Sequence, residues 1–489
     1  MSTVQPVRVV VAGGGTAGWI AATAIVRQLG SLVDVTLVES DAIGTVGVGE
    51  ATIPTARSFH ELLKIDEAAF MAATGATYKL GILFENWGAL DDRYLHSFGT
   101  FDLKTWAADF HHFWLEGRSR GIVGPVGSYC AEHEAALAGR FSRDMSYAYH
   151  LDASRYAAFL RQIAERDGAK RLEGQILEVE RHSETGDISA LLLNNGARVE
   201  GDLFVDCTGF RGLLIEQTLQ SGFEDWGEWL STDTAIAVQT DDTAGLPPYT
   251  RAIAHEAGWQ WRIPLQHRMG NGIVFSSQDM DEDRAREVLL ASISGKTQSE
   301  PRPIRYRTGK RREAWKANCV ALGLSAGFVE PLESTSIHLI MIGVTRLIQM
   351  FPFQGSTASV RERWNALADE ELERIRDFII LHYKLTERSD SSFWRRCNSM
   401  AVPDSLRFRI ESFSEAAQAW QGSGDLFRVE SWVQVMLGQR LDPKGWHRLG
   451  KLMGDDRLAS ELERARQHIA TRIGKMPDHR SSIATLSAS

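Results

Sequence analysis

The sequence is poor in cysteine and carries no excess of positive charge. Its four cysteines among 489 residues are scattered, and none forms a C-x-x-C pair. We therefore expect buried or free thiols in a reducing compartment, and neither a disulfide framework nor a zinc site. The formal net charge is -9. Because binding to nucleic acid needs a basic surface, nucleic acid is not an expected partner.

Long hydrophobic runs are also missing. A membrane-spanning helix needs about 20 mostly apolar residues, and the apolar run near the N-terminus is interrupted by Gly13, Gly14 and Gly15. The same segment lacks the positive charges that begin a secretory signal. We therefore predict a cytoplasmic protein that makes no membrane contact. The hydrophobic content of 43% and charged content of 24% are those of a globular protein.

The most informative motif lies near the N-terminus, where the apolar residues 9–11 lead into Gly13, Gly15 and Gly18 with the spacing G-x-G-x-x-G. Gly13 permits a tight turn, Gly15 lets the backbone approach a pyrophosphate, and Gly18 lets helix and strand pack closely. A second predicted strand ends at Glu39, whose carboxylate is placed to accept hydrogen bonds from ribose hydroxyls. The segment predicts a βαβ unit that binds a dinucleotide.

A second signature identifies the dinucleotide. Residues 149–166 predict an amphipathic helix with Asp152 as its N-cap. Alternating strands follow, separated by turns at Thr185-Gly186 and Asn195-Gly196. The last strand ends in D-x-T-G, from Asp206 to Gly209. This pattern beside a Rossmann-type unit is usual in FAD-dependent oxidoreductases, so FAD is a better prediction than NAD. A second G-x-G-x-x-G for a nicotinamide is absent.

Two segments carry polar groups whose roles the spacing leaves open. Lys79 lies in an apolar, strand-like segment, where a lysine is more often an edge residue reaching solvent than a catalytic group. The adjacent His111 and His112 point to different sides of a predicted helix, and no partner has the spacing of H-E-x-x-H. We expect these histidines to pack or line a pocket, and we predict no metal.

Two later segments have both a structural and a functional explanation. Trp259 and Trp261 share one face of a predicted strand, and this spacing favours aromatic packing between sheets. Glu333, Ser334 and Thr335 lie at or just before the N-terminus of a predicted helix. Free backbone N–H groups at such a point bind anions, but a Ser-Thr pair serves equally as an N-cap.

Together these motifs resemble those of the flavin-dependent halogenases in the tryptophan halogenase family. The resemblance runs from residue 7 to about residue 400. W-x-W-x-I-P is similar to the mark that separates these halogenases from flavin hydroxylases. The matching segments are GGGTAGW (13–19), GEATIP (49–54), TYKLGI (77–82), HSFG (96–99), WQWRIP (259–264) and GFVEPLEST (327–335).

The resemblance implies an α/β fold, with an FAD-binding, Rossmann-like box of the hydroxylase type and an added, mostly helical pyramid subdomain. Residues 1–360 are expected to form the box, including an antiparallel substrate sheet, with a helical insertion at about 100–150 that belongs to the pyramid. Residues 361–475 are expected to form the C-terminal helical part. We expect residues 476–489 to be a disordered tail.

The resemblance also implies the reaction. Reduced FAD from a separate flavin reductase, oxygen and a halide (bromide or chloride) give hypohalous acid, which passes along a tunnel to Lys79. Lys79 hydrogen-bonds hypohalous acid or forms a haloamine. Glu333 activates the electrophile, or stabilises and deprotonates the arenium intermediate, and Ser334 relays between Glu333 and flavin. The product is a halogenated indole or other electron-rich aromatic, released by a monomer or homodimer.

Further residues take their roles from the same resemblance. The halide is held by the backbone N–H groups of Thr335 and Ser336, although tryptophan-specific members have glycine at the second position. The residues implied in FAD binding are Gly13, Gly15, Thr16, Ala17, Gly18, Glu39, Gly49, Glu50, Ala51, Ile176, Asp206, Leu324 and Ile337. The residues implied in the substrate pocket are His96 and Phe98, and those of the tunnel motif are Trp259, Trp261, Ile263 and Pro264.

The substrate is expected to differ from that of the tryptophan-specific members. Their tyrosine-containing C-terminal pocket stretch is not recognisable at residues 438–450. Two other functions share part of the pattern. An FAD-dependent aromatic monooxygenase would share the FAD motifs, but it would need neither Lys79 nor the tryptophan pair. A non-catalytic FAD-binding protein would keep the glycine turn and tolerate loss of Glu333.

Overall fold

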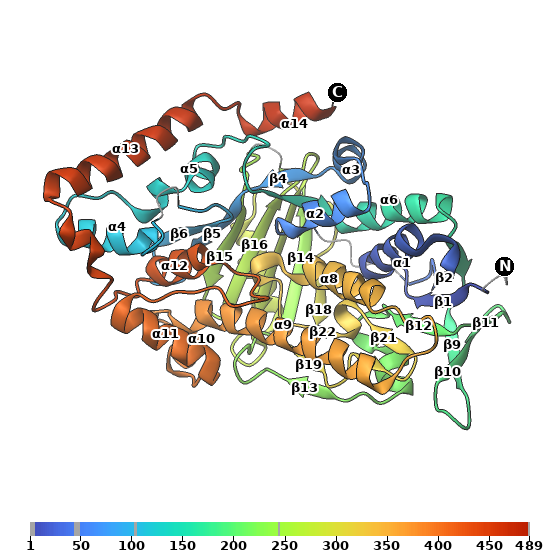
Figure 1. Ribbon diagram of the computed structural model, residues 1–489. Coiled ribbons are helices and arrows are strands. Elements are labelled where there is room, and N and C mark those ends of the chain that lie inside the picture. The colour runs from blue at the N-terminus through green and yellow to red at the C-terminus, as the bar shows by residue number, and fades with distance from the viewer. Residues whose placement is uncertain (1–4, 44–48, 102–104, 243–244, 488–489) are drawn as a thin grey trace. The chain divides into compact units, whose positions relative to one another are not determined.

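The computed structural model describes residues 5–43, 49–101, 105–242 and 245–487 (Figure 1). Two compact units are built from interleaved parts of the chain. The first contains residues up to Ala76, Leu151–Ser231 and Tyr306–Glu373, and the second contains Thr77–His150, Thr232–Arg305 and the residues from Arg374 onward. The antiparallel sheet, which the family resemblance implied to be part of the FAD-binding box, therefore groups with the C-terminal helices in the second unit.

A six-stranded sheet forms the centre of the first unit. Its strand order is β20 (Trp315–Lys316), β21 (Cys319–Ala321), β12 (Leu203–Asp206), β1 (Val7–Ala12), β2 (Val33–Glu39) and β8 (Lys170–Glu173). All neighbouring pairs are parallel except β20 and β21. Val9, Val10 and Val11 are completely or almost completely buried, as expected for the middle strand of a parallel sheet.

Helices of the first unit follow the predicted pattern with local differences. The βαβ unit contains α1 (Thr16–Leu29), and Asp152 caps α6 (Ala153–Arg166) by accepting from the N–H of Arg155, which confirms the predicted cap. Residues 55–74 form two helices, α2 (Thr55–Leu62) and α3 (Glu67–Thr74), rather than one. The helix is interrupted between them because Asp66 begins a new helix, its side chain accepting a hydrogen bond from the N–H of Ala69.

The remaining elements of the first unit surround this sheet. The turns at Gly186 and Gly196 have positive φ, and the strands they join are antiparallel, as predicted. These strands are β9 (Ile176–Arg181), β10 (Ile188–Leu193) and β11 (Arg198–Glu200). Other elements are β3 (Gly49–Ala51), β13 (Phe223–Asp225), β19 (Gly309–Arg311), β22 (Gly327–Phe328), α8 (Ser336–Gln349) and the start of α9 (Ala358–Lys384).

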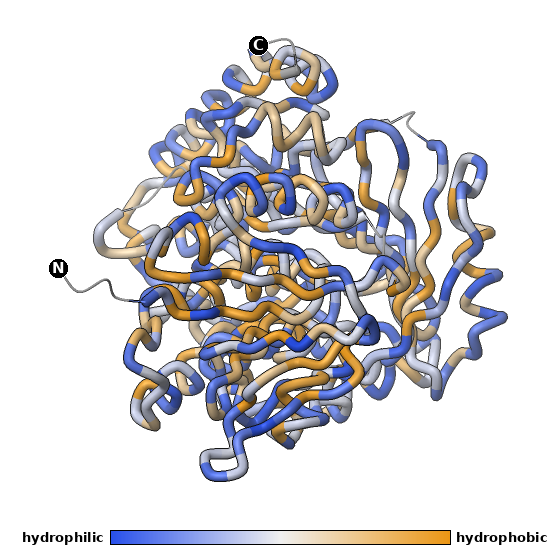
Figure 2. The backbone as a smooth tube through the Cα atoms, turned by 90° about the vertical axis from the view of Figure 1, so that its right-hand side faces the viewer, coloured by the Kyte–Doolittle hydropathy of each residue, from blue (hydrophilic) through white to orange (hydrophobic). Residues whose placement is uncertain are grey.

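The second unit contains a seven-stranded sheet. Its order is β18 (Arg302–Arg305), β14 (Thr234–Thr240), β17 (Met269–Phe275), β16 (Gly258–Pro264), β15 (Thr250–His255), β5 (Gly81–Glu85) and β6 (Arg93–Ser97). Only β15 and β5 run parallel. Figure 2 shows hydrophobic stretches of the backbone alternating with hydrophilic stretches along the chain.

Helices account for most of the rest of the second unit. They are α4 (Phe110–Ser119), α5 (Ala131–Leu137), α7 (Glu282–Ser292), α10 (Ser392–Ser399), α11 (Asp404–Ala416), α12 (Val429–Gly438), α13 (Asp455–Gly474) and α14 (His479–Ser487). The prediction that residues 476–489 form a disordered tail is wrong for α14, because His479 is 2% exposed and anchors this helix. In the described part of the chain, no helix combines the length and apolar character needed to cross a bilayer. All four cysteines are buried and free, as predicted.

The glycines of the N-terminal turn differ sharply in the space around them, which gives a test of the fold. A Cβ atom on Gly18 would lie 1.8 Å from the carbonyl oxygen of Gly13, whereas one on Gly15 would meet nothing within 4 Å. We expect Gly18→Ala to lower the free energy of unfolding by about 2–4 kcal/mol.

Gly15→Ala is the matched control, because Gly15 has an extended backbone (φ -75°) that alanine adopts readily. It should leave the unfolding free energy unchanged or raise it by up to about 1 kcal/mol. Urea unfolding of the two variants measures the difference. Equal destabilisation by both would contradict the packing role of Gly18.

Candidate functional site

The glycine turn of the first unit has an open backbone at one point. Gly13 has φ 108°, and its N–H donates to the carbonyl of Val38 at 2.8 Å. A Cβ atom on Gly13 would lie 2.3 Å from the carbonyl oxygen of Cys207, so the turn requires glycine here. Gly15 faces open space instead. Packing therefore leaves no space beside the backbone at Gly13 and Gly18, whereas the backbone at Gly15 is accessible to a ligand.

The N-terminus of α1 is available to an anion. Gly15 is the N-cap, no side chain caps the helix, and its first turn holds no acidic residue. Gly15, Thr16 and Ala17 are half-buried rather than sealed in the core. Uncapped backbone N–H groups with the positive end of the helix dipole bind a phosphate well. These residues fit the pyrophosphate of FAD.

Two carboxylates flank this turn, and the protein uses them differently. Glu39 ends β2, where Arg171 Nε donates to its Oε1 at 2.5 Å and the Trp19 indole N–H lies 3.4 Å from its Oε2. Asp206 is fully buried and accepts hydrogen bonds from Thr208 and from the backbone N–H groups of residues 214 and 215. Asp206 thus shapes the D-x-T-G turn, while Glu39 lies at the strand end predicted to meet a ribose.

The other predicted FAD residues also lie in the first unit. Glu50 has its pKa raised to about 7, first by burial and then by the negative charge of Asp152. Its carboxyl group is therefore protonated for part of the time near neutral pH, which sequence spacing did not indicate. The remaining positions are Gly49 and Ala51 in β3, Ile176 at the start of β9, Leu324 in a 3-10 turn and Ile337 in the first turn of α8.

The segment before α8 has a strained backbone. Glu333 and Ser334 have φ values of 64° and 58°, a region that residues other than glycine occupy at a cost of about 1–3 kcal/mol each. Glu333 and Thr335 are each 1% exposed. The Thr335 side chain makes no capping hydrogen bond, although Thr335 is the N-cap residue. Simple capping therefore does not explain this sequence, and the strain fits a functional constraint.

In the second unit Lys79 is completely buried. It ends β4 (Thr77–Lys79), which pairs with β7 (Ala148–Asp152) so that Lys79 lies opposite Ala148. Its Nζ lies 5.3 Å from the centre of the Phe98 ring. The pKa of His150 is held well below its ordinary value by burial and by the charge of Lys79. An edge residue reaching solvent is therefore the wrong explanation of Lys79.

Hydrogen bonds fix the strand of Lys79 on several sides. The Thr77 hydroxyl donates to the carbonyl of Pro264 at 2.7 Å, and the Leu80 N–H donates to the carbonyl of Pro248 at 2.7 Å. The Tyr78 N–H donates to Nε2 of His479 at 3.1 Å, while His479 Nδ1 donates to the carbonyl of Leu246 at 2.6 Å. His479 was missed in the sequence because it lies 401 residues from Tyr78.

The predicted aromatic residues gather on the same unit. The Phe98 N–H donates to the carbonyl of Leu80 at 2.8 Å, which ties it to the chain beside Lys79. The rings of Trp259 and Trp261 are 6.2 Å apart and edge-to-face, as expected for residues on one strand face. Gly272 makes room for them, because a Cβ atom there would lie 2.0 Å from the Trp261 ring.

His96 joins a further aromatic group in this unit. It is 2% exposed, and its ring centre lies 5.5 Å from that of Phe378 and 6.3 Å from that of Phe427. His111 and His112 serve packing, as expected: His111 Nε2 bonds to the carbonyl of Ala417 at 2.8 Å, and His112 Nδ1 accepts from the N–H of residue 447 at 3.2 Å.

Comparison with known proteins defines the class. The family model of tryptophan halogenases matches residues 8–455. Tryptophan 6-halogenase SttH from Streptomyces toxytricini is 36% identical over 455 residues, which cover 84% of each chain. The structure of a flavin-dependent halogenase from Xanthomonas campestris is 50% identical, covers 99% of this chain and 98% of that one, and has a TM-score of 0.97. BrvH, a flavin-dependent halogenase from Brevundimonas sp. BAL3, is 42% identical with a TM-score of 0.94, covering 98% of this chain and 99% of that chain.

The protein is therefore an enzyme of the flavin-dependent halogenase class. It belongs to the tryptophan halogenase family. The resemblance inferred from the motifs is confirmed, as is the α/β fold with an FAD-binding, Rossmann-like part and a helical subdomain.

The hydrogen bond from the Tyr78 N–H to Nε2 of His479, called the His479 clamp below, predicts that part of the protein's stability is lost in acid. Burial lowers the pKa of His479 to about 4, whereas an unfolded histidine titrates near 6.5. The unfolded chain therefore binds more protons between these values, and stability falls as the pH drops from about 6.5 to 4. The titration of His479 alone should lower the free energy of unfolding by about 2 kcal/mol when the pH falls from 7 to 5.

His479→Asn removes this titration while keeping a side chain that donates and accepts hydrogen bonds. Urea unfolding of the variant at pH 7 and pH 5 should show a smaller difference between the two values than the wild type shows. Identical pH dependence in both proteins would contradict the assigned role of His479.

Proposed function

We propose that the protein halogenates an indole or another electron-rich aromatic compound, using FADH2, oxygen and bromide or chloride, and that Lys79 directs the halogenating species. The supporting observation is the burial of Lys79 beside Phe98 in a member of this family. Reduced FAD bound at the turn supplies the oxygen chemistry that converts halide to hypohalous acid. The backbone N–H groups near Gly15 and the carboxylate of Glu39 hold the cofactor, and a separate flavin reductase supplies it in reduced form.

In this proposal Lys79 controls where hypohalous acid reacts. Hypohalous acid diffuses freely and attacks many groups, so its use requires a dry environment and a fixed donor. The Lys79 side chain is shielded from water, and the strand that carries it is held by Thr77 and Leu80. An N–H donor fixed in this way positions the reactive halogen against a single carbon.

Glu333 and the residues after it have complementary roles. Electrophilic attack on an aromatic ring creates positive charge, which a pre-positioned carboxylate stabilises before it accepts the ring proton. Glu333 is buried and strained in its position, so little reorganisation accompanies the reaction. Thr335 and Ser336 present backbone N–H groups at the start of α8, and we propose that these hold the halide. Ser334 relays a proton between Glu333 and the flavin in this scheme.

The substrate is proposed to be different from, or broader than, the tryptophan in the name of the relative SttH. Two residues of the 438–450 segment are already engaged by the protein. The Trp446 indole N–H donates to Glu116 at 2.9 Å, and the backbone N–H of His447 donates to His112. This segment lacks the tyrosines of the tryptophan-specific members and contacts α4 instead. A different or broader aromatic substrate follows.

A reconstituted assay tests the proposed activity. The protein is incubated with a flavin reductase, NADH, FAD, oxygen and sodium bromide or chloride, together with a panel that includes indole and tryptophan. We expect halogenated indole by mass spectrometry, with more product from indole than from tryptophan. Hydroxylated product would indicate a monooxygenase, and no product from any substrate would favour a non-catalytic FAD-binding protein.

Substitution of Lys79 tests its role separately from the fold. Lys79→Met preserves the buried volume but removes the N–H donor, so halogenation should fall by at least about 100-fold. FAD binding, followed by flavin fluorescence, should stay within about twofold of wild type, since the glycine turn is untouched. The exposed lysine variant Lys451→Ala is the control and should keep full activity. Retained regioselective halogenation by Lys79→Met would overturn the role.

Substitution of Glu333 tests whether its carboxylate takes part in halogenation. Glu333→Gln keeps the size of the side chain but removes its charge, and halogenation should fall by roughly 100-fold or more with little change in FAD binding. The same assay and fluorescence titration measure both quantities. A variant that halogenates at the wild-type rate would exclude the carboxylate from the reaction.

A further inference from the structure

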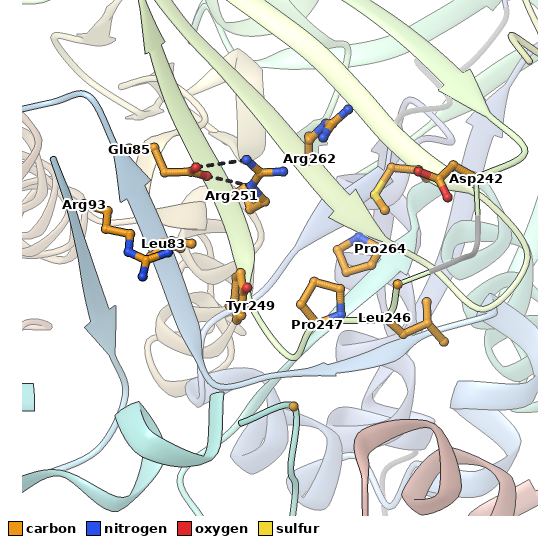
Figure 3. Close-up of a pocket in the computed structure, with 13 residues that line it drawn as sticks. Leu83, Glu85, Arg93, Asp242, Leu246, Pro247, Tyr249, Arg251, Arg262 and Pro264 are labelled. Atoms are coloured by element: carbon orange, nitrogen blue, oxygen red, sulfur yellow. Dashed lines mark hydrogen bonds and ion pairs between the residues drawn. The ribbon is translucent and has the colours of Figure 1, made fainter. Parts of the chain in front are cut away.

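The seven-stranded sheet has a cavity on the face opposite the paired tryptophans. Alternation along β16 places Trp259 and Trp261 on one face and Arg262 on the other. The cavity on the arginine face has a volume of ≈ 570 Å³ (Figure 3). Sites for small molecules usually have volumes of about 300–1,000 Å³. Of the residues given catalytic, halide, cofactor, substrate or tunnel roles above, only Pro264 lines it.

Two arginines face this cavity directly opposite each other. Arg251 on β15 and Arg262 on β16 are register partners in the antiparallel pair, and like charges so placed repel. Arg251 is compensated, because its Nε and a terminal nitrogen donate to the two carboxylate oxygens of Glu85 at 2.6 and 2.9 Å (Figure 3). Glu85 thus neutralises one member of the pair.

Arg262 lacks an equivalent partner. Its Nη2 donates to the neutral carbonyl of Ser292 at 2.7 Å, but its Nε is buried and has no hydrogen-bond partner in the described structure. Burial, and then the charge of Arg251, lower the pKa of Arg262, while Asp242 and Glu85 raise it. A buried, unsatisfied N–H on a cation costs about 1–3 kcal/mol unless an acceptor is present.

The rest of the lining defines the kind of acceptor. Arg93 on β6 adds a third positive charge, so three arginines face the two carboxylates of Glu85 and Asp242 and leave one net positive charge. Apolar groups complete the wall, among them Pro247 and Pro264 (Figure 3). A ligand that matches this lining has one negative charge and an apolar body.

We infer that this cavity is a second binding site, which takes a small organic carboxylate. The carboxylate pairs with the guanidinium of Arg262, which lines the cavity, and is attracted by Arg93, and the apolar body packs against the two prolines. Hydrogen bonds between a guanidinium and a carboxylate are among the strongest in proteins, so recognition depends on the charge of the ligand.

Calorimetric titration of the full-length, FAD-loaded protein tests this site. Cyclohexanecarboxylate is the probe, because it has an apolar body but no aromatic ring to halogenate, and cyclohexanecarboxamide is its neutral counterpart. We expect saturable binding of the carboxylate at one site and at least tenfold weaker binding of the amide. Arg262→Gln should weaken carboxylate binding at least tenfold.

Two further variants complete the test. Arg302→Gln changes an exposed arginine of the same sheet that does not line the cavity, and it should bind the carboxylate as the wild type does. Arg93→Gln changes an exposed rim residue, so it reports on the site even if Arg262→Gln fails to fold, and it should weaken binding about threefold or more. Equal binding of acid and amide would overturn the proposal. So would carboxylate affinity that neither Arg262→Gln nor Arg93→Gln changes, or that Lys79→Met abolishes.

Discussion

The burial of a lysine ammonium without access to water is the constraint on which the second unit depends. A buried charge is expensive unless its surroundings compensate it, so the strand that carries Lys79 must be held firmly. Thr77, Tyr78 and Leu80 each bond to a different part of the chain, and the tryptophan motif contributes one of these contacts through Pro264. Aromatic packing and lysine position are thus parts of one arrangement, which explains why W-x-W-x-I-P accompanies Lys79.

In the first unit the comparable cost is backbone strain. Two consecutive residues before α8, Glu333 and Ser334, occupy the left-handed region without glycine. The turn at Gly13 also needs a positive φ, but glycine adopts it without cost. The segment before α8 therefore carries backbone strain at two successive residues, whereas the glycine turn reaches its positive φ without strain.

The features that the sequence predicted are those that local sterics determine. The G-x-G-x-x-G turn, the Asp152 cap and the pairing of Trp259 with Trp261 all follow from neighbouring residues. The burial of Lys79 could not be predicted from its neighbours alone, since a lysine between apolar residues is ordinarily solvated, and only the family resemblance indicated its importance. The left-handed Glu333 and the clamp by His479 gave no local signal, because their causes lie in tertiary contacts.

The clamp by His479 also affects the order in which the protein becomes complete. Tyr78 and His479 are 401 residues apart, and at about 5–20 residues per second the ribosome needs roughly 20–80 s to make the intervening chain. Throughout that interval the strand of Lys79 exists without its last hydrogen-bond acceptor. A polypeptide that ends before α14 would contain every recognisable motif and still lack the hydrogen bond between Tyr78 and His479. The strand of Lys79 therefore gains this hydrogen bond only after the segments that carry all of the recognisable motifs have been made.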